Sequence, residues 1–405
     1  MALIVQKYGG TSVGDIDRIR HVAKRVLATQ SEGNELVVVV SAMSGVTDRL
    51  LRWAGELNEK PAEREVDMLL ATGEQTTIAL LAIAIEGLGG RAVSLTGAQA
   101  GIVTDGVHTR ARIANITPDE IHRFLGEGRI VIVAGFQGRT QAGQITTLGR
   151  GGSDLTAIAL AGALGASICQ IYTDVDGVYT CDPRIVPNAK KLAEVSYDEM
   201  LELASAGAKV MQSRAVEFGK KFGVTFEVKS SFHSGEGTIV KEETPNMEQV
   251  VIRGVSVERK QAKITLTKLP DQPGVAARIF KAIAGAGVVV DMIVQNVSTD
   301  GSTDLSFTLN EAELAPAKET LGPILTELGA EDLIARGGIA KLSVVGIGMR
   351  SHSGVAAQLF DILSSAGINI QMISTSEIKI AVVVEESEIE KAARAAHDGF
   401  GLGKA

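Results

Sequence analysis

The sequence has few of the residues that mark several common protein classes. Its two cysteines, Cys169 and Cys181, fit neither a disulfide framework nor a CxxC metal or redox site. Aromatic residues make up only 4% of the chain, and no lysine- and arginine-rich run appears. The chain has 40 basic and 48 acidic residues, and the resulting net charge of -8 argues against nucleic acid as the main partner.

Long hydrophobic runs are also missing. The apolar stretch at the N-terminus ends at Lys7, which makes it too short for the core of a signal peptide. The longest uncharged stretch, 155–173, contains Gly162 and Gly165 and is interpreted as a buried helix followed by a strand. We therefore expect a cytoplasmic protein with no membrane partner.

Glycine, by contrast, is abundant, with 45 of the 405 residues, whereas average usage is roughly 7%. This excess indicates tight loops or close approaches of the backbone to ligands. Apolar residues make up 45% of the chain, enough for a large core. The length predicts two or three domains.

The first 230 residues alternate short Val- and Ile-rich runs with helical periodicities. This alternation predicts a largely parallel sheet covered by helices on both faces, with ligands at the carboxyl ends of the strands. From 230 to 248 the composition changes to Ser, Gly, Glu, Thr and Pro, which indicates a linker or edge hairpin. The expected strands are Leu3–Val5, Leu36–Val40, Ile130–Ala134, Ile168–Tyr172 and Thr225–Val228.

The remainder of the chain contains an internal repeat. The twenty residues from Gly274 align without gaps onto the twenty from Gly354, with nine identities at an offset of 80 residues. Each copy follows a short strand, contains a helix and continues into another strand. A repeat of this length predicts a tandem pair of small α/β domains, of the kind that more often binds ligands than catalyses reactions.

Motifs of several other enzyme classes are absent: the chain has no GxxxxGK[ST] and no HExxH. The six histidines show no metal-ligand spacing. We therefore expect no metal bound directly by the protein.

The first expected strand ends in Lys7-Tyr8-Gly9-Gly10-Thr11-Ser12. The glycines allow backbone N–H groups to approach an anion, and the lysine supplies a point charge, as in a phosphate site. An ordinary strand-to-helix turn explains the same segment equally well.

Further polar segments follow the other expected strands. Arg150 lies among three glycines in 144–154, where a guanidinium is a natural partner for a carboxylate or phosphate. The hydroxyl-rich segment 41–48, the acidic segment 173–184 and Glu74 are each ambiguous alone, since such residues also cap helices and turns. Their convergence at the strand ends of one sheet is the argument for a site.

These segments together resemble the aspartate kinase family. The matching motifs are 7–12, VVSAMSGVTD at 39–48, TLGRGGSD at 147–154 and TDVDGVYTCDPR at 173–184, and the C-terminal repeats resemble ACT domains. The resemblance implies an α/β amino-acid kinase fold, an αβα sandwich with a mainly parallel sheet, followed by two ACT-like α+β domains. The expected divisions are 1–245 for the catalytic domain, 246–262 for a linker and first regulatory strand, 263–340 and 341–405 for the ACT-like domains.

The resemblance also implies an activity: MgATP-dependent phosphorylation of the β-carboxylate of L-aspartate, the first step towards lysine, threonine, methionine and diaminopimelate. It assigns Lys7 and Asp154 to catalysis. It assigns the nucleotide to Lys7, Tyr8, Gly9, Gly10, Thr173, Asp174, Tyr179, Arg184 and Lys209. It assigns aspartate to Ser41, Thr47, Glu74, Arg150, Gly151, Gly152 and Ser153.

The chemistry agrees with these assignments. A β-carboxylate has an ordinary pKa of about 4 and needs no general base at neutral pH. The obstacle is its repulsion from the γ-phosphate, so positioning and charge neutralisation are required. Lys7 and the Mg²⁺ carried by ATP would offset the charge, with Asp154 orienting Lys7. Arg150 and Glu74 would hold the α-carboxylate and α-amino groups.

We expect feedback inhibition by lysine, threonine or both at the ACT-like repeats. Asp271 and Asp291 would receive an ammonium group, Gln295 would bind polar ends, and helix N–H groups near Ala276 would take a carboxylate. The full expected effector set is Asp271, Gly274, Val275, Ala276, Asp291, Gln295, Val355, Asn369, Ile370 and Glu377. The expected assembly is a homo-oligomer or a complex with a separately made regulatory subunit, for which Met247 could be an internal start.

Two alternatives stay open. The chain could be another kinase of the same fold, acting on acetylglutamate, glutamate or uridylate, although the motif at Lys7 and the tandem repeats disfavour this. It could also be an amino-acid sensor with an inactive kinase part, which the presence of Lys7, Glu74, Arg150 and Asp154 disfavours. We expect no fused homoserine dehydrogenase, because the repeats extend to the last residues.

Overall fold

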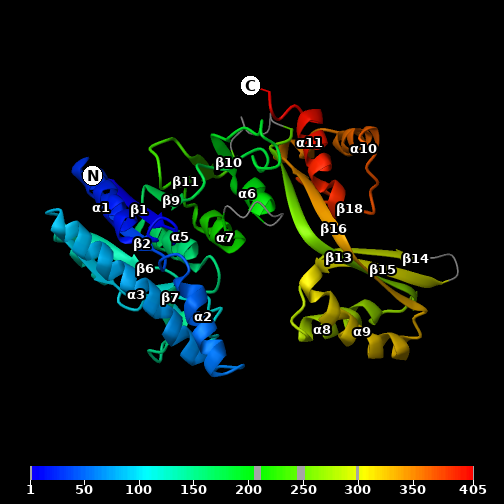
Figure 1. Ribbon diagram of the computed structural model, residues 1–405, viewed down its shortest axis with the longest axis horizontal. Coiled ribbons are helices and arrows are strands. Elements are labelled where there is room, and N and C mark those ends of the chain that lie inside the picture. The colour runs from blue at the N-terminus through cyan, green and yellow to red at the C-terminus, as the bar shows by residue number, and fades with distance from the viewer. Residues whose placement is uncertain (1, 205–210, 244–250, 298–300, 405) are drawn as a thin grey trace. The chain divides into compact units, whose positions relative to one another are not determined.

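The computed structural model describes residues 2–204, 211–243, 251–297 and 301–404 (Figure 1). Contacts divide the chain into two compact units. The first, called here the kinase unit, comprises Met1–Val178, Lys191–Ser205 and Lys209–Met247. The second, the regulatory unit, comprises Tyr179–Lys190, Ala206–Ala208 and Glu248–Ala405.

The kinase unit is built on an eight-stranded sheet in the order β10-β12-β11-β9-β1-β2-β6-β3. Its neighbouring strands are parallel except for β11 and β12, which run antiparallel. All five strands expected from the sequence are present, and the mainly parallel sheet is confirmed. The bounds are β1 Leu3–Tyr8, β2 Glu35–Val40, β3 Ala92–Leu95, β6 Ile130–Ala134, β9 Ile168–Thr173, β10 Glu194–Ser196, β11 Phe226–Ser230 and β12 Thr238–Lys241.

Helices pack on the faces of this sheet. Successive side chains of β1 point to opposite faces, as in any strand. Tyr8 joins a buried apolar cluster with residues of α1 and α3, whereas its neighbour Lys7 reaches α5. The bounds are α1 Ile16–Ser31, α2 Val46–Leu57, α3 Glu63–Gly87, α4 Asp119–Gly126, α5 Gly152–Leu164, α6 Tyr197–Leu203 and α7 Ser213–Phe222.

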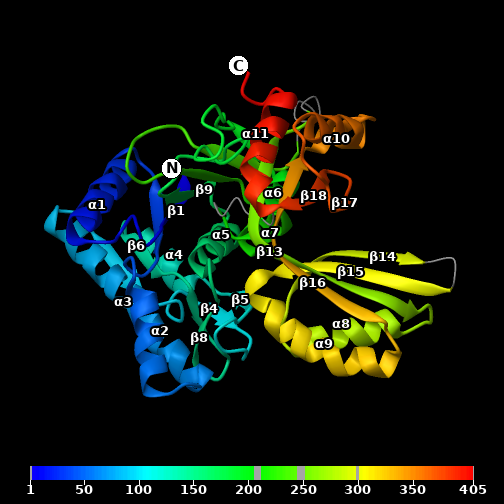
Figure 2. The same cartoon turned by 45° about the vertical axis from the view of Figure 1, so that its right-hand side comes forward.

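A second, four-stranded sheet of the kinase unit has the order β5-β4-β7-β8 and is visible below α5 in Figure 2. Its strands β7 and β8 lead from the end of β6 to the beginning of α5, so they bring the glycine-rich segment around Arg150 to the edge of the main sheet. The bounds are β4 Ile102–Thr104, β5 Ile113–Ile116, β7 Gln137–Arg139 and β8 Ile145–Thr147.

Helix α3 is long and apolar enough to cross a membrane by length and composition alone. Its side chains Ile78, Leu81 and Ile85 instead join the apolar cluster on the main sheet, and it also buries the acids Asp67 and Glu74. A core helix of this kind passes the same test as a membrane span. The helix is therefore weak support for a membrane location.

The regulatory unit contains one six-stranded antiparallel sheet in the order β14-β15-β13-β16-β18-β17. The repeated helices begin at Val275 and Val355 and end at Gly285 and Ser365, so they keep the offset of the sequence repeat. The bounds are β13 Gly254–Pro270, α8 Val275–Gly285, β14 Val290–Val297, β15 Ser302–Asn310, η2 Glu311–Glu313, α9 Leu314–Leu328, β16 Asp332–Val345, η3 Ile347–Arg350, α10 Val355–Ser365, β17 Met372–Thr375, β18 Lys379–Glu385, η4 Glu386–Glu388 and α11 Ile389–Gly399.

The two repeats share their central strands rather than forming separate sheets. The first part of β13, Gly254–Glu258, pairs with Lys341–Val345 in the second repeat. The later part of β13 pairs with β15 of the first repeat. Residues 254–258, part of the segment expected as a linker and first regulatory strand, therefore complete the second repeat.

A segment from the middle of the sequence also belongs to the regulatory unit. Cys181 and Val186 lie in the hydrophobic core beneath α10 and α11. The Thr180 hydroxyl is 2.9 Å from Nε2 of the fully buried His397, and the Thr180 carbonyl accepts from Val255 N–H at 2.7 Å. The division by contacts thus differs from the continuous 1–245 block expected from the sequence, while the other expected boundaries stay predictions.

Candidate functional site

The carboxyl ends of β1 and β2 face a cavity of about 530 Å³ in the kinase unit. The loops after these strands, the middle of α3 and the beginning of α5 contribute its lining. All of the predicted catalytic and aspartate-binding residues lie around it. They are Lys7, Ser41, Thr47, Glu74, Arg150, Gly151, Gly152, Ser153 and Asp154.

An ion pair between Lys7 and Asp154 forms one wall of the cavity. Lys7 Nζ lies 2.6 Å from Asp154 Oδ1, and Lys7 is 8% exposed. Lys7 is on β1 and Asp154 is in the first turn of α5, so two rigid elements hold the pair. A cation held in this way can stabilise an anion that enters the cavity.

The loop after β1 approaches the loop after β2 closely. A Cβ atom at Gly10 would lie 2.8 Å from the carbonyl oxygen of Ala42, so a larger residue would force the two loops apart. A Cβ at Gly9 would lie 3.4 Å from Lys7 Nζ. Gly10 therefore lets the two loops pack closely, and Gly9 leaves the space beside the lysine open.

Glu74 on α3 is a buried acid with one unused oxygen. Its Oε1 accepts a hydrogen bond from Ala42 N–H at 3.0 Å, while Oε2 has no hydrogen-bond partner among the described residues. Burial raises the pKa of Glu74 from 4.5 to about 7. A ligand ammonium at Oε2 would favour the charged form.

The loop 149–152 depends on glycine for its conformation. Gly149 and Gly151 have φ values of +79° and +70°, in the left-handed region that favours glycine. Arg150 between them is exposed and makes no hydrogen bond or ion pair with any residue described in the structure. Its guanidinium is thus available to bind a carboxylate.

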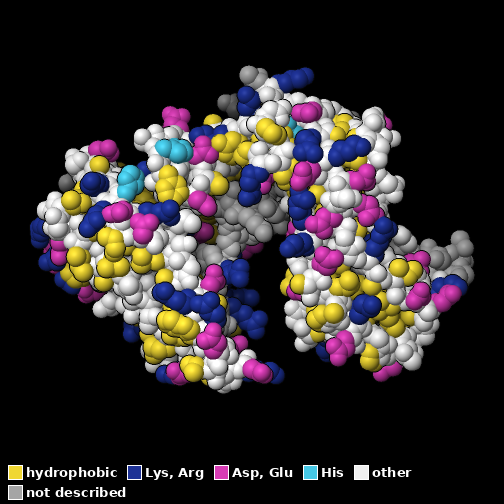
Figure 3. Space-filling model, in the orientation of Figure 1, with side chains coloured by type: hydrophobic (Ala, Val, Ile, Leu, Met, Phe, Trp, Pro, Cys, Tyr) yellow, Lys and Arg dark blue, Asp and Glu magenta, His cyan; other side chains and the backbone are white. Residues whose placement is uncertain are grey.

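The surface of the kinase unit suits anionic ligands. Figure 3 shows Lys and Arg side chains, in dark blue, gathered beside α2 and β7 on the visible face. Clustered cations raise the local concentration of anionic ligands.

The predicted nucleotide residues are less well gathered. Lys7 and Gly10 line the cavity, and Thr173 at the end of β9 donates to Asp174 Oδ1 at 3.0 Å. Tyr179 and Arg184 belong to the regulatory unit, where Arg184 pairs with Asp182. Lys209 lies outside the described residues.

The Tyr8 side chain, on a residue predicted to contact the nucleotide, does not line the cavity. Its side chain is fully buried on the opposite face of β1 from Lys7, stacks on Tyr172 at 4.7 Å and donates to Gln6 Oε1 at 3.1 Å. Burial raises the pKa of the Tyr8 phenol well above its ordinary value.

In the regulatory unit, a cavity of about 370 Å³ gathers half of the expected effector residues, namely Asp271, Gly274, Val275, Ala276 and Gln295. Asp291 does not line it and instead pairs with Lys341. In the second repeat, Val355 is buried in the core, Ile370 packs against the same core and Glu377 pairs with Arg350. Asn369 is exposed at the end of the loop after α10.

Sequence reasoning missed a buried network beside the cavity, formed by Asp67, His108, Thr109 and Thr147. The available signal was an acid within the apolar run VDMLLAT, seven residues before Glu74 and so on the same face of a helix. No group of three or more His, Cys, Asp or Glu side chains suited to a metal occurs among the described residues.

Comparisons with known proteins agree with this architecture. The amino acid kinase family matches residues 2–230, and the ACT domain matches 263–324 and 342–400. An aspartate kinase of Stutzerimonas stutzeri is 53% identical over 99% of this chain and 98% of its own length.

Solved structures show the same likeness. E. coli aspartokinase III in complex with aspartate and ADP has a TM-score of 0.80 at 26% identity, covering 98% of this chain and 99% of that one. The same enzyme with lysine and aspartate has a TM-score of 0.79 at 26% identity, with the same coverage of both chains. The chain therefore belongs to the aspartate kinases, an amino acid kinase domain followed by two ACT domains.

Proposed function

We propose that the kinase unit transfers the γ-phosphoryl group of MgATP to the β-carboxylate of L-aspartate and forms 4-phospho-L-aspartate. A β-carboxylate oxygen would form a bond to the γ-phosphorus while the bond to the β,γ-bridging oxygen breaks, and ADP leaves with that electron pair. The observation that supports this most is the presence of the Lys7–Asp154 pair, Glu74 and Arg150 around one cavity.

Each end of aspartate has a complementary group in this cavity. The unpartnered Oε2 of Glu74 would accept the α-ammonium, and the Arg150 guanidinium would bind the α-carboxylate as a fork. The β-carboxylate would then be directed towards Lys7, because the other two charged groups are already held. Positioning of this kind supplies much of the rate when the nucleophile is already ionised.

Lys7 would stabilise the charge on the transferring phosphoryl group, and Asp154 would keep Lys7 in place. Mg²⁺ would neutralise part of the phosphate charge when bound. Since the described residues contain no cluster of three or more metal-binding side chains, phosphate oxygens and water would supply most of its ligands.

A hydroxamate assay tests the reaction. Hydroxylamine traps an acyl phosphate, so the enzyme is supplied with MgATP and, in turn, L-aspartate, succinate, L-glutamate and N-acetyl-L-glutamate. Uridylate would form no acyl phosphate, so it is tested by the release of ADP. We expect a signal with L-aspartate alone, because succinate lacks the ammonium that Glu74 would bind. A stronger signal with another acceptor would assign the chain a different substrate.

We also propose that lysine, threonine or both inhibit the enzyme by binding in the regulatory unit. The cavity lined by Asp271, Gln295 and the N-terminus of α8 offers groups for both ends of an amino acid. One supporting structure is that of the E. coli enzyme, whose crystals contained lysine and aspartate. An effector acts only through different affinities for two conformations. If millimolar lysine plus threonine changes neither the activity nor the melting temperature, this regulation is wrong.

The pathway, location and assembly are proposed on the same basis. The product would enter the synthesis of lysine, threonine, methionine and diaminopimelate in the cytoplasm. The enzyme would act as a homo-oligomer or with a separately made regulatory subunit beginning near Met247, which lies outside the described residues. Light scattering together with N-terminal sequencing of the purified protein distinguishes these assemblies.

A further inference from the structure

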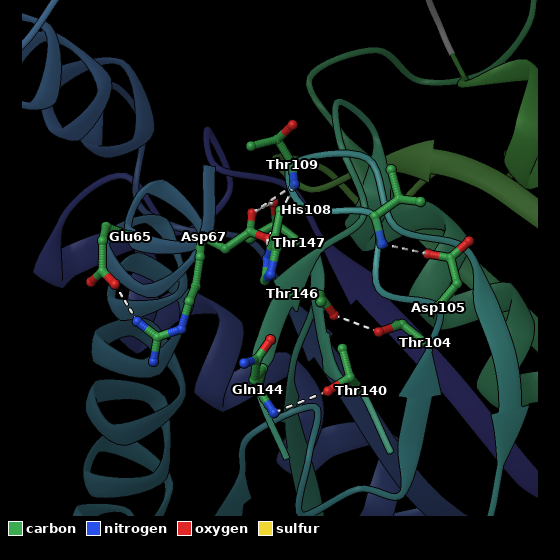
Figure 4. A network of polar contacts seen from close by, with 12 residues as sticks. Glu65, Asp67, Thr104, Asp105, His108, Thr109, Thr140, Gln144, Thr146 and Thr147 are labelled. Atoms are coloured by element: carbon green, nitrogen blue, oxygen red, sulfur yellow. Dashed lines mark hydrogen bonds and ion pairs between the residues drawn. The ribbon is translucent and has the colours of Figure 1, made fainter. Parts of the chain in front are cut away.

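Asp67 is a fully buried carboxylate that joins three parts of the kinase unit (Figure 4). It lies near the beginning of α3 and accepts hydrogen bonds from Thr109 N–H at 3.0 and 3.1 Å and from the Thr147 hydroxyl at 2.5 Å. His108 Nδ1 lies 2.7 Å from Oδ2 of Asp67. Buried charges are costly unless they are fully hydrogen-bonded, and this one is.

One of its partners has an unfavourable backbone conformation. Thr109 has a φ of +64°, and a β-branched residue rarely adopts the left-handed region without support from its surroundings. Asp67 supplies that support by accepting the Thr109 N–H with both carboxylate oxygens. The structure therefore ties a strained residue to a rigid helix.

The strained residue is part of the cavity wall. Thr109 lines the cavity, and a Cβ at Gly149 would lie 3.4 Å from the Thr109 carbonyl oxygen. Gly149 directly precedes Arg150, and Thr147 is the last residue of β8. Asp67 thus holds Thr147, which precedes the turn that presents Arg150, and Thr109, which lies against Gly149 in that turn.

The other end of the cavity depends on the same helix. Glu74 follows Asp67 by seven residues, which is about two helical turns on the same face. One helix therefore carries Glu74 directly and determines the position of Arg150 through Thr109 and Thr147.

We infer that Asp67 is a positioning residue that sets the distance between Glu74 and Arg150, and so the affinity for aspartate. This inference rests on the proposed function, because it assigns those two residues to the α-ammonium and α-carboxylate. Asp67 would touch neither substrate. Its loss would release Thr109 from its strained conformation and let the Arg150 loop shift.

The experiment compares Asp67→Asn with Asp105→Asn. Asp105 is a matched control because it accepts from Val107 and Arg112 N–H groups in the same loop but is only partly buried. We expect Asp67→Asn to raise the KM for aspartate about 10- to 100-fold, since small misplacements of a binding group have effects of this size. The KM of Asp67→Asn for ATP should stay at the wild-type level. Asp105→Asn should keep the wild-type KM for both aspartate and ATP.

A second variant tests the route through Thr109. Glycine adopts a positive φ without strain, so adding Thr109→Gly to Asp67→Asn should recover part of the aspartate affinity. A merely structural role for Asp67 predicts no such recovery. Should Asp67→Asn not fold, Thr147→Val removes one donor at constant volume, and we expect a smaller rise in the same KM.

The outcomes separate the two hypotheses. If the wild type phosphorylates aspartate but neither Asp67→Asn nor Thr147→Val raises its KM, or Asp105→Asn raises it equally, the inference is wrong. If Thr109→Gly gives no recovery, positioning through Thr109 is wrong. If the wild type does not phosphorylate aspartate at all, the proposed function fails instead.

Discussion

Lys7 Nζ lies 2.6 Å from Asp154 Oδ1, which joins the end of β1 to the first turn of α5. The pair lines the same cavity as Glu74 and Arg150. The cation of Lys7, the acid Glu74 and the guanidinium of Arg150 therefore surround one space. This arrangement allows the site to hold the charged ends of an amino acid while it stabilises a transferring phosphoryl group.

Replacing Lys7 by alanine should lower kcat about 10²- to 10³-fold, because the variant loses an electrostatic contact to developing charge. Steady-state kinetics measure this effect, and circular dichroism checks the fold. Lys24→Ala, at an exposed position on α1, is the matched control and should keep its full activity. A folded Lys7→Ala enzyme with wild-type turnover would remove Lys7 from the catalytic residues.

The KM for aspartate should depend on pH through Glu74. Burial raises the pKa of Glu74 to about 7, so the carboxyl is mostly neutral below that pH and cannot pair with an ammonium. The KM should therefore fall as pH rises through 7 and increase about tenfold for each pH unit below it. Because the pKa is higher in the folded protein than in the unfolded chain, the free energy of unfolding of the ligand-free protein should fall as the pH rises from 4.5 to 7.

Glu74→Gln provides the control for this dependence. The variant cannot titrate, so its KM for aspartate should be high and nearly constant between pH 6 and 8. A wild-type profile with no inflection near neutral pH would contradict the assignment of Glu74 to the ammonium.

Arg150→Lys should raise the KM for aspartate and leave the affinity for ATP almost unchanged. Lysine keeps the charge but cannot form the two parallel hydrogen bonds of a guanidinium. Arg139→Lys, at an exposed position on β7, is a suitable control. Loss of ATP binding with an unchanged KM for aspartate would instead place Arg150 in the nucleotide site.

Gln295→Ala should weaken inhibition by lysine or threonine and spare the uninhibited activity. Gln295 lines the cavity of the first repeat, whereas Gln358 on α10 does not. Inhibition curves for Gln295→Ala, Gln358→Ala and the wild type measure the effect. Equal inhibition of all three enzymes would exclude Gln295 from the effector site.

Much of the fold was predictable because its signals are local. The apolar strands of the main sheet and the repeated helices each depend on patterns within about twenty residues. The polar residues of the site could be grouped because parallel strands bring their carboxyl ends to one edge. The alternation of side chains along β1 could also have placed Tyr8 on the face opposite Lys7.

Contacts between distant segments were not predictable in this way. Nothing near Thr180 indicates that it meets His397, more than two hundred residues later, and this contact places Tyr179–Lys190 in the regulatory unit. The hydrogen bonds that Asp67 accepts from Thr109 and Thr147 likewise span separate elements. Such contacts follow from tertiary packing, which overrides the local pattern.

The central claim is that a β-carboxylate oxygen of aspartate attacks the γ-phosphorus at the Lys7–Asp154 pair. It is tested most directly with L-aspartate carrying ¹⁸O in the β-carboxylate, followed by ³¹P NMR of the product. The account predicts an acyl phosphate signal shifted by a bridging ¹⁸O with the wild type, and the same signal formed far more slowly with Lys7→Ala. An unshifted acyl phosphate signal, or none with the wild type, would contradict it.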